Sequence, residues 1–304
     1  MTVKKIEVSA DNAGRRLDNY LFSIYKNVPK SKLYNIIRKG ELRINSGRVK
    51  PNRKLEVGDL IRIPPNLENS ESPDRKINIP PKMLITLRER IIYEDGNYIV
   101  LNKPAGLAVH GGTDNSFGVI DVLRQMFDDS IDLCHRIDKD TSGCLVLSKN
   151  KLSNRHFNSA LVAKSVTKKY ITILKGHLKS GLKVDVAIEK SFDTQTKSTI
   201  SSEGKDSASF FKPLQKLNQC SLVEVEIYTG RTHQIRVQAE HIGHPVVNDD
   251  KYGDRTFNRS ELLKSSKRMA LHSSEVWFVD QNNEMIKCEA ELDTSFNDLI
   301  DLLK

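Results

Sequence analysis

The spacing of apolar residues divides the chain into a short first region and a longer second one. Apolar positions recur at intervals of three and four over 17–24 and over 30–39, which predicts two amphipathic helices. Apolar and polar residues alternate over 42–45 and over 60–63, with turn residues between them, which predicts two strands. The apolar face of the first helix is expected to hold Leu17, Tyr20, Leu21 and Ile24.

The pattern continues beyond residue 83 as a mixture of strands and helices. Strands are expected over 91–93, 98–101, 144–147, 168–174, 184–188, 222–228 and 271–279, and helices over 119–127, 151–164 and 296–303. The polar stretch 191–206 is expected to form a hairpin or a loop. In the helix over 151–164, the residues expected to face the core are Leu152, Phe157, Ala160 and Leu161. This mixture predicts an α+β fold.

A proline-rich stretch separates the two regions. Residues 64–81 combine several prolines with Asn, Ser and Glu, a composition that is typical of a linker. We therefore expect a small first domain over 1–68, a linker over 69–82 and a second domain over 83–304.

The positive charge of the 304-residue chain is concentrated in the first domain. The net charge is +9; residues 1–68 hold 15 Lys and Arg against 7 Asp and Glu, and the remaining residues hold 33 against 32. A basic module on a near-neutral body is typical of a part that binds nucleic acid, and a basic terminus that only increases solubility is the alternative. The basic residues expected on its surface are Arg15, Arg16, Lys30, Lys32, Arg38, Lys39, Arg43, Arg48, Lys50, Arg53 and Lys54.

No metal or cofactor is expected from the spacing of the usual ligands. The four cysteines form no Cys-x-x-Cys pair, and scattered cysteines are typical of buried thiols in a reducing compartment. His244, Asp249 and Asp250 lie near one another in sequence but lack the spacing of a zinc site.

The hydropathy of the chain also predicts no membrane partner. No apolar run approaches the ~20 residues that cross a bilayer, and the first residues lack the apolar segment of a signal peptide. A cytoplasmic protein is expected.

The stretch 135–143, His-Arg-Ile-Asp-Lys-Asp-Thr-Ser-Gly, places many ionisable groups directly before the apolar run 144–147. Burying an unpaired charge is unfavourable, so this stretch is either a solvated loop or a site. Thr-Ser-Gly predicts a tight turn. On an extended segment Arg136 and Asp138 would point the same way, which places a guanidinium beside a carboxylate.

A second polar cluster follows the strand expected over 222–228. The sequence over 229–236, Thr-Gly-Arg-Thr-His-Gln-Ile-Arg, turns through a glycine into a helix that Thr232 is expected to cap. Arg231, His233 and Arg236 would then gather at the end of the sheet, and an exposed helix start is the alternative.

These motifs resemble those of a known enzyme family. Residues 135–143 are similar to the H-R-L-D-x-x-T-S-G motif of the RluA/RluC family of RNA pseudouridine synthases, with Ile137 in place of the leucine. Residues 229–236 match the family's T-G-R-T-H-Q-I-R motif, and Lys168-x-Tyr170 matches a third motif. The first domain resembles the S4 RNA-binding domain, whose helix pair precedes a hairpin in the same order.

The resemblance implies a fold and a reaction. The fold is a small S4 domain followed by a catalytic domain with a mixed, mainly antiparallel sheet, flanking helices and an active-site cleft across the middle. The reaction is the isomerisation of uridine to pseudouridine, without cofactor or metal, on a base flipped out of its stack. Among family members the resemblance is nearest to those that modify 23S ribosomal RNA. The expected partner is that RNA or a ribosomal precursor particle, and the protein is expected to be a monomer.

The same resemblance implies roles for individual residues. Asp138 would be the essential carboxylate, acting as nucleophile or as base, and Arg236 would pair with it. Tyr170 would stack on the uracil. Arg136 would fill the space that the flipped base vacates or steady the backbone. The other residues expected to bind RNA are Arg231, His233, Arg15, Arg16, Lys30, Lys32, Arg38, Lys39 and Arg43.

Three alternatives stay open. The enzyme could act on another structured RNA. Asp138 and Asp140 would lie about 6–7 Å apart on an extended segment, within range for the paired carboxylates of a glycosidase, although a single Trp argues against a sugar-binding cleft. A catalytically silent RNA-binding ribosome assembly factor is the third; it predicts a missing Asp, Tyr or Arg, and the chain has all three.

Overall fold

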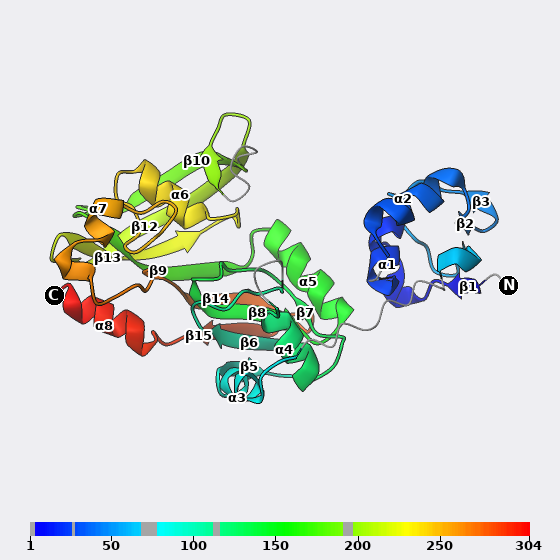
Figure 1. The fold of residues 1–304 in the computed structure, drawn as a ribbon, viewed down its shortest axis with the longest axis horizontal. Coiled ribbons are helices and arrows are strands. Elements are labelled where there is room, and N and C mark those ends of the chain that lie inside the picture. Colours follow the sequence, from blue (N-terminus) through cyan, green and yellow to red (C-terminus); the bar gives the residue numbers. More distant parts are fainter. Residues whose placement is uncertain (1–3, 26–27, 68–77, 112–115, 191–196) are drawn as a thin grey trace. The chain divides into compact units, whose positions relative to one another are not determined.

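The computed structural model describes residues 4–25, 28–67, 78–111, 116–190 and 197–304 (Figure 1). The chain divides into two compact units, 1–76 and 77–304. Most of the expected linker lies outside the described residues. Ile79, near its end, is buried in the core of the second unit. Each unit is described below by itself.

The first unit packs two helices against a four-stranded sheet with the order β1-β4-β2-β3. Its core is formed by the predicted helix faces and the inward positions of the strands, although Ile24, in the last turn of the first helix, stays 42% exposed. Gly40 ends the second helix in a left-handed conformation (φ 72°). The elements are β1 (Lys4–Glu7), α1 (Leu17–Ile24), α2 (Lys30–Lys39), β2 (Arg43–Ile44), β3 (Gly47–Arg48) and β4 (Leu60–Ile63).

The second unit is built on a sheet of 11 described strands. Every pairing is antiparallel except that of β14 with β8, so the predicted mixed, mainly antiparallel sheet is confirmed. Along the sheet the order is β11-β10-β12-β13-β9-β14-β8-β6-β5, with β15 beside β14 and β7 beside β8. The strands are β5 (Ile91–Glu94), β6 (Tyr98–Lys103), β7 (Asp132–Leu133), β8 (Ser142–Ser148), β9 (Thr167–Lys175), β10 (Leu182–Lys190), β11 (Ser198–Ile200), β12 (Lys205–Leu217), β13 (Cys220–Ile227), β14 (Leu271–Val279) and β15 (Met285–Glu289).

Helices cover the faces of this sheet. Successive residues of β8 belong to different cores: Leu145 and Leu147 pack with α3 and α4, while Cys144 and Val146 pack with Phe157 of α5. Because side chains alternate along a strand, β8 is buried on both faces, which explains its unbroken apolar run. The helices are α3 (Pro81–Glu89), α4 (Val119–Met126), α5 (Lys151–Val162), α6 (Gln234–His241), α7 (Arg255–Asn258) and α8 (Thr294–Leu302).

Two local predictions are wrong. Leu152 is 64% exposed, because it lies five residues before the buried Phe157 and so about 140° around the helix from it. The tight turn is not at Thr-Ser-Gly but at 138–141, where Thr141 N–H donates to the Asp138 carbonyl. Gly143 is already in β8 (φ 102°), and a Cβ there would lie 2.1 Å from the Ser273 carbonyl oxygen of β14. The glycine is therefore required by close contact of two strands.

Two other local expectations, for the stretch 191–206 and for the cysteines, agree with the described residues. The polar stretch 191–206 contains β11, which pairs with β10, and a turn into β12; residues 191–196 lie outside the description. All four cysteines are free and buried, and burial raises the pKa of the Cys134 thiol to about 12. In the part of the chain that is described, no helix has the length and apolar character needed to cross a bilayer.

Candidate active site

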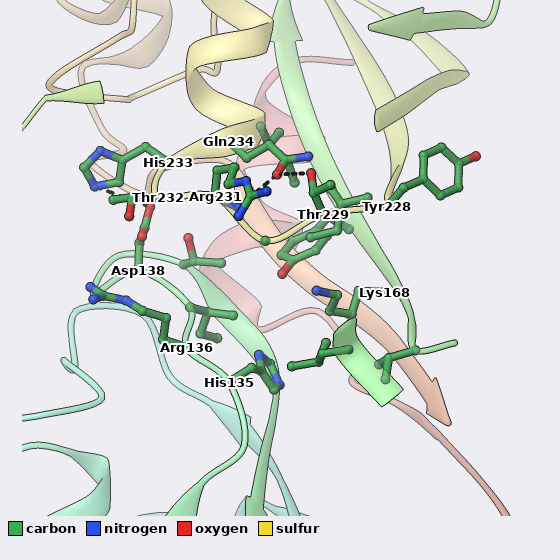
Figure 2. A pocket seen from close by; sticks show the side chains of 18 of the residues that line it. His135, Arg136, Asp138, Lys168, Tyr228, Thr229, Arg231, Thr232, His233 and Gln234 are labelled. Atoms are coloured by element: carbon green, nitrogen blue, oxygen red, sulfur yellow. Dashed lines mark hydrogen bonds and ion pairs between the residues drawn. The ribbon is translucent and has the colours of Figure 1, made fainter. Parts of the chain in front are cut away.

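A cavity of about 590 Å³ lies where the two sequence motifs meet (Figure 2). Its walls come from the loop before β8, from the end of α5, from β9 and from the loop between β13 and α6. The motifs are far apart in sequence, and the pairing of β9 with β13 and of β14 with β9 and β8 brings them together. Six of the expected site residues line it: Arg136, Asp138, Tyr170, Arg231, His233 and Arg236.

The backbone around Asp138 is held from both sides. Before it, the His135 ring stacks on Phe157, and Nε2 accepts a hydrogen bond from Val146 N–H at 3.0 Å. After it, Lys103 Nζ donates to the Lys139 carbonyl at 2.9 Å, and Arg268 Nη1 donates to the Asp140 carbonyl at 3.0 Å. The carboxylate is therefore carried on a fixed loop. Sequence reasoning missed both cations; a lysine ending an apolar strand was the only signal for Lys103.

The Asp138 carboxylate faces Arg236 of α6. Arg236 Nη1 donates to Asp138 Oδ2 at 2.9 Å, while Nε and Nη2 donate to the two oxygens of Asp249 at 2.6 and 2.8 Å. Asp249 is fully buried and also accepts from the N–H groups of Lys251 and Tyr252. One guanidinium thus bridges two carboxylates through three of its five N–H donors.

The electrostatics of this bridge favour the charged forms. Burial opposes the charge of Arg236, but its hydrogen bonds and attraction to Asp249 and Asp138 raise the pKa above the ordinary arginine value. Burial alone would raise the pKa of Asp249, and Arg236 with the two backbone N–H groups lowers it instead. Sequence reasoning considered Asp249 only as a metal ligand and missed its ion pair with Arg236. Among the described residues, no group of three or more His, Cys, Asp or Glu is arranged to hold a metal.

His233 lies beside the same carboxylate without forming an ion pair at neutral pH. Its Nε2 is 3.8 Å from Asp138 Oδ2, and its Nδ1 shares a 2.9 Å hydrogen bond with the Tyr252 hydroxyl. Burial lowers the pKa of His233 below its usual value, although Asp138 partly opposes this. The imidazole is therefore largely uncharged at pH 7.

The prediction that Thr232 caps the following helix is wrong. α6 begins at Gln234, and the residue before it, His233, has a left-handed backbone (φ 56°) and makes no capping bond through its side chain. Gln234 Oε1 instead accepts from Arg231 N–H at 3.0 Å and from the Thr229 hydroxyl at 2.7 Å. The helix's own first side chain folds back to satisfy the loop, and this turns His233 toward Asp138.

Tyr170 and Lys168 reach the cavity from the same face of β9. Tyr170 is 6% exposed. Burial, with a smaller contribution from the Asp138 carboxylate, raises the pKa of its hydroxyl, so the ring is neutral. A buried neutral ring beside a carboxylate can support a flat apolar ligand.

The structure pairs Asp138 with neither of the two side chains that the sequence suggested. Arg136 is exposed and lines the cavity, but within the described residues the cation paired with Asp138 is Arg236. Asp140 is exposed and absent from the cavity wall, because the chain turns at 138–141 and is not extended there. The paired-carboxylate arrangement of a glycosidase is therefore not present.

In the first unit, most of the predicted basic residues are exposed. Lys30, Lys32, Arg38 and Lys39 are exposed along α2 or its end. Arg16 is engaged by Asp18 at 2.6 Å, and Arg43 donates to the Gly40 carbonyl at 3.3 Å. Arg15 is half-buried and lies over the Tyr20 ring.

Fold and cavity together define a class of RNA-modifying enzyme. Residues 97–241 match the family described as RNA pseudouridylate synthase, and residues 15–61 match the S4 domain. The chain belongs to the RNA pseudouridine synthase family and is an RNA pseudouridine synthase. The predicted family and fold are thereby confirmed.

Similar proteins of known name cover the whole chain. It is 38% identical to the ribosomal large subunit pseudouridine synthase C of Haemophilus influenzae, over 100% of this chain and 96% of that protein. It is 40% identical to the protein of the same name from Yersinia pestis, over 96% of this chain and 92% of that protein. Among solved structures, human RNA pseudouridylate synthase domain containing 1 is 26% identical, with a TM-score of 0.61 over 74% of this chain and 91% of that one.

Proposed function

We propose that this protein converts specific uridines of large-subunit (23S) ribosomal RNA to pseudouridine. The observation that carries the proposal is the Asp138 carboxylate, 2.9 Å from Arg236 Nη1 in the wall of the cavity. The substrate class is supported by full-length relatives named as ribosomal large subunit pseudouridine synthases. The target is free 23S RNA or a ribosomal precursor particle.

In this proposal the cavity holds a uridine flipped out of its stack, which costs a few kcal/mol of lost stacking and pairing. Asp138 acts at the sugar, either attacking C1′ as a nucleophile or removing a sugar proton as a base. Its side chain is 19% exposed against 7% for Arg236, so the carboxylate keeps an edge open to the cavity while the guanidinium orients it. Tyr170 stacks on the uracil.

Three further residues of the cavity contact the RNA in this proposal. Arg136, which is exposed at the cavity wall, occupies the space that the flipped base leaves or steadies the backbone. Arg231 and His233 bind the RNA from the β13–α6 loop. The cytoplasmic location and the monomeric state expected from the sequence are part of the same proposal.

The test maps pseudouridine on a 23S RNA transcript by carbodiimide adducts and reverse-transcription stops, without added nucleotide or metal. We expect stops with the unchanged protein and none with Asp138→Asn, which keeps the side chain's shape but removes its charge. The Kd of the variant for the transcript should lie within about threefold of that of the unchanged protein, because Asp138 contributes no attraction to phosphates.

Either of two results would count against the proposal. Stops that persist with Asp138→Asn would remove the carboxylate from the chemistry. Tight binding without stops from the unchanged protein would favour another structured RNA as substrate or a silent assembly factor. Melting curves of both proteins are the control that the variant is folded.

We also propose that the basic first unit binds RNA through its exposed Lys and Arg side chains. Deleting residues 1–68 is expected to raise the Kd for the transcript by about tenfold or more, because several phosphate contacts are lost. The rate with saturating protein should change by less than about threefold. Equal rates at limiting RNA with and without these residues would contradict this role.

A further inference from the structure

β9 carries two adjacent lysines with different surroundings. In the sheet, Lys169 lies opposite Glu226 of β13 and Glu275 of β14, and its Nζ is 3.6 Å from Glu275 Oε1. Lys168 lies opposite Ile227 and Val276. Because side chains alternate along a strand, Lys169 meets the carboxylates on one face and Lys168 meets apolar residues and the cavity on the other.

Lys168 is buried without compensation. It is 6% exposed and lines the cavity (Figure 2). Its Nζ lies 3.5 Å from the position that a Cβ on Gly230 would occupy, so the ammonium reaches the loop between β13 and α6. Within the described residues it has no hydrogen-bond or ion-pair partner, and burial alone lowers its pKa to about 8.

A second buried lysine shows how this chain satisfies an ammonium whose role is structural. Lys103 is fully buried, and its Nζ donates to the carbonyls of Pro104, Leu107 and Lys139 at 2.8 to 2.9 Å. Burying a cation without such partners is unfavourable. The unfilled hydrogen bonds of Lys168 therefore point to an acceptor that enters the cavity.

We propose that the Lys168 ammonium donates a hydrogen bond to a carbonyl oxygen of the target uracil and stabilises the negative charge that the ring acquires when its bond to ribose breaks. This inference rests on the proposed function and deepens it. Residues two apart on a strand are about 7 Å apart. With Tyr170 stacked on the uracil, the four-carbon stem of Lys168 therefore brings the ammonium to the edge of the same ring.

The chemistry of the isomerisation requires such a charge. When N1–C1′ breaks, its electron pair stays on the ring as a uracil anion, shared by N1 and the two carbonyl oxygens. Until the new bond forms, C1′ is held in an ester with Asp138 if the aspartate is the nucleophile, or the sugar lacks the proton that Asp138 removed if it is the base. When the C5–C1′ bond forms, the ester bond breaks or the sugar takes its proton back, C5 loses its proton to solvent, and N1 takes up a proton. A fixed cation in a site with little water stabilises this anion more than it stabilises neutral uridine. Each nitrogen of the Arg236 guanidinium already donates to Asp138 or Asp249, so its charge is shared with these two carboxylates.

The other ionisable groups of the cavity do not neutralise Lys168. From the loop before β8, His135 has a pKa lowered to about 3 by burial, and Asp138 is paired with Arg236. Tyr170 on β9 and Tyr228 after β13 have pKa values raised by burial. The remaining charged groups of the wall are cations, and they are Arg136, Lys164 and Arg231.

The test compares single-turnover rates and Kd values for Lys168→Met, Lys168→Arg and the matched control Lys169→Met. The RNAs are transcripts of 23S, 16S and transfer RNA. Lys168→Met is expected to slow the reaction at saturating protein about 100-fold. Its Kd for the RNA should lie within about twofold of that of the unchanged protein. Lys168→Arg should regain at least about tenfold of that loss, and Lys169→Met should stay within about twofold of the unchanged protein.

The pH profile adds a readout that a structural role would not move. The rate of the unchanged protein should fall as pH rises above about 8, where the Lys168 ammonium loses its proton. Lys168→Arg should hold its rate to higher pH, because a guanidinium stays charged.

Other results would overturn the inference. A higher Kd for Lys168→Met with its saturated rate intact would assign the ammonium to an RNA phosphate. Equal losses in Lys168→Met and Lys168→Arg with lowered melting temperatures would assign it to the fold. Product in 16S or transfer RNA alone would contradict 23S RNA as the substrate, and the Lys168 variants would then be compared on that RNA. No product in any transcript would overturn both the proposed function and the role of Lys168.

Discussion

The two ends of the cavity treat buried charge in opposite ways. At one end Arg236 bridges Asp138 and Asp249, and backbone N–H groups complete the shell of Asp249. At the other end Lys168 lies among apolar side chains without a partner in the described part of the chain. The first end is complete in the free protein, and in our proposal the second is completed by the bound uracil. The contrast is between an ion-paired end, where the partners are supplied by the chain itself, and an end where the described residues supply no partner for a buried cation.

This difference predicts opposite effects on stability when one charge is removed at each end. Arg236→Met leaves the fully buried Asp249 without its partner, and breaking a buried ion pair in this way costs about 3–5 kcal/mol. We expect the free energy of unfolding at pH 7, from urea titration, to fall by that amount. The same variant should lose pseudouridine formation, because Asp138 is no longer oriented.

The control for this variant is Arg231→Met, which removes an exposed arginine whose Nε donates to the Asp206 carbonyl. Its unfolding free energy should change by less than about 1 kcal/mol, as is usual for exposed positions. A loss of under about 1 kcal/mol for Arg236→Met as well would show that the bridge does not hold the site together, and the two ends would then be alike.

Local patterns in the sequence predicted the helices and strands and the main residues of the site. Periodicity identified both helices of the first unit and the strands that meet at the cavity, because each signal lies within a few residues of chain. The motif residues Asp138, Tyr170 and Arg236 do line one cavity. Their roles there stay predictions until the variants are measured.

What the sequence could not supply are contacts made across the sheet. Lys103 and Arg268 as anchors of the loop depend on strand pairings between distant segments. Asp249 as the partner of Arg236 depends on how the loop after α6 folds back onto that helix. Arg136 lines the same cavity as Asp138, but within the described residues the guanidinium that pairs with this carboxylate is that of Arg236, which lies 98 residues further along the chain. Lys168 and Lys169 look alike in sequence, and only the register of β9 against β13 and β14 distinguishes them.

The smaller stability effect belongs to the Lys168 end, and its sign is reversed. Burial lowers the pKa of Lys168 from 10.5 to about 8, so at pH 7 its charge destabilises the folded state by up to about 3 kcal/mol. Lys168→Met should therefore unfold with a free energy up to about 3 kcal/mol higher than that of the unchanged protein. Lys169→Met, which only breaks a partly exposed pair, should differ by less than about 1 kcal/mol.

The stability difference between Lys168→Met and the unchanged protein should depend on pH, which a change in packing alone would not produce. Between pH 8 and 10.5 the unfolded chain binds more protons at this position than the folded one, so the unchanged protein gains stability there as pH rises. In parallel urea titrations, the unfolding free energy of Lys168→Met should exceed that of the unchanged protein most near pH 7. This difference should shrink toward zero as pH approaches 10.5. A variant that is less stable at pH 7, or whose difference stays constant with pH, would mean that Lys168 is already satisfied by the fold. The contrast between the two ends of the cavity would then be lost.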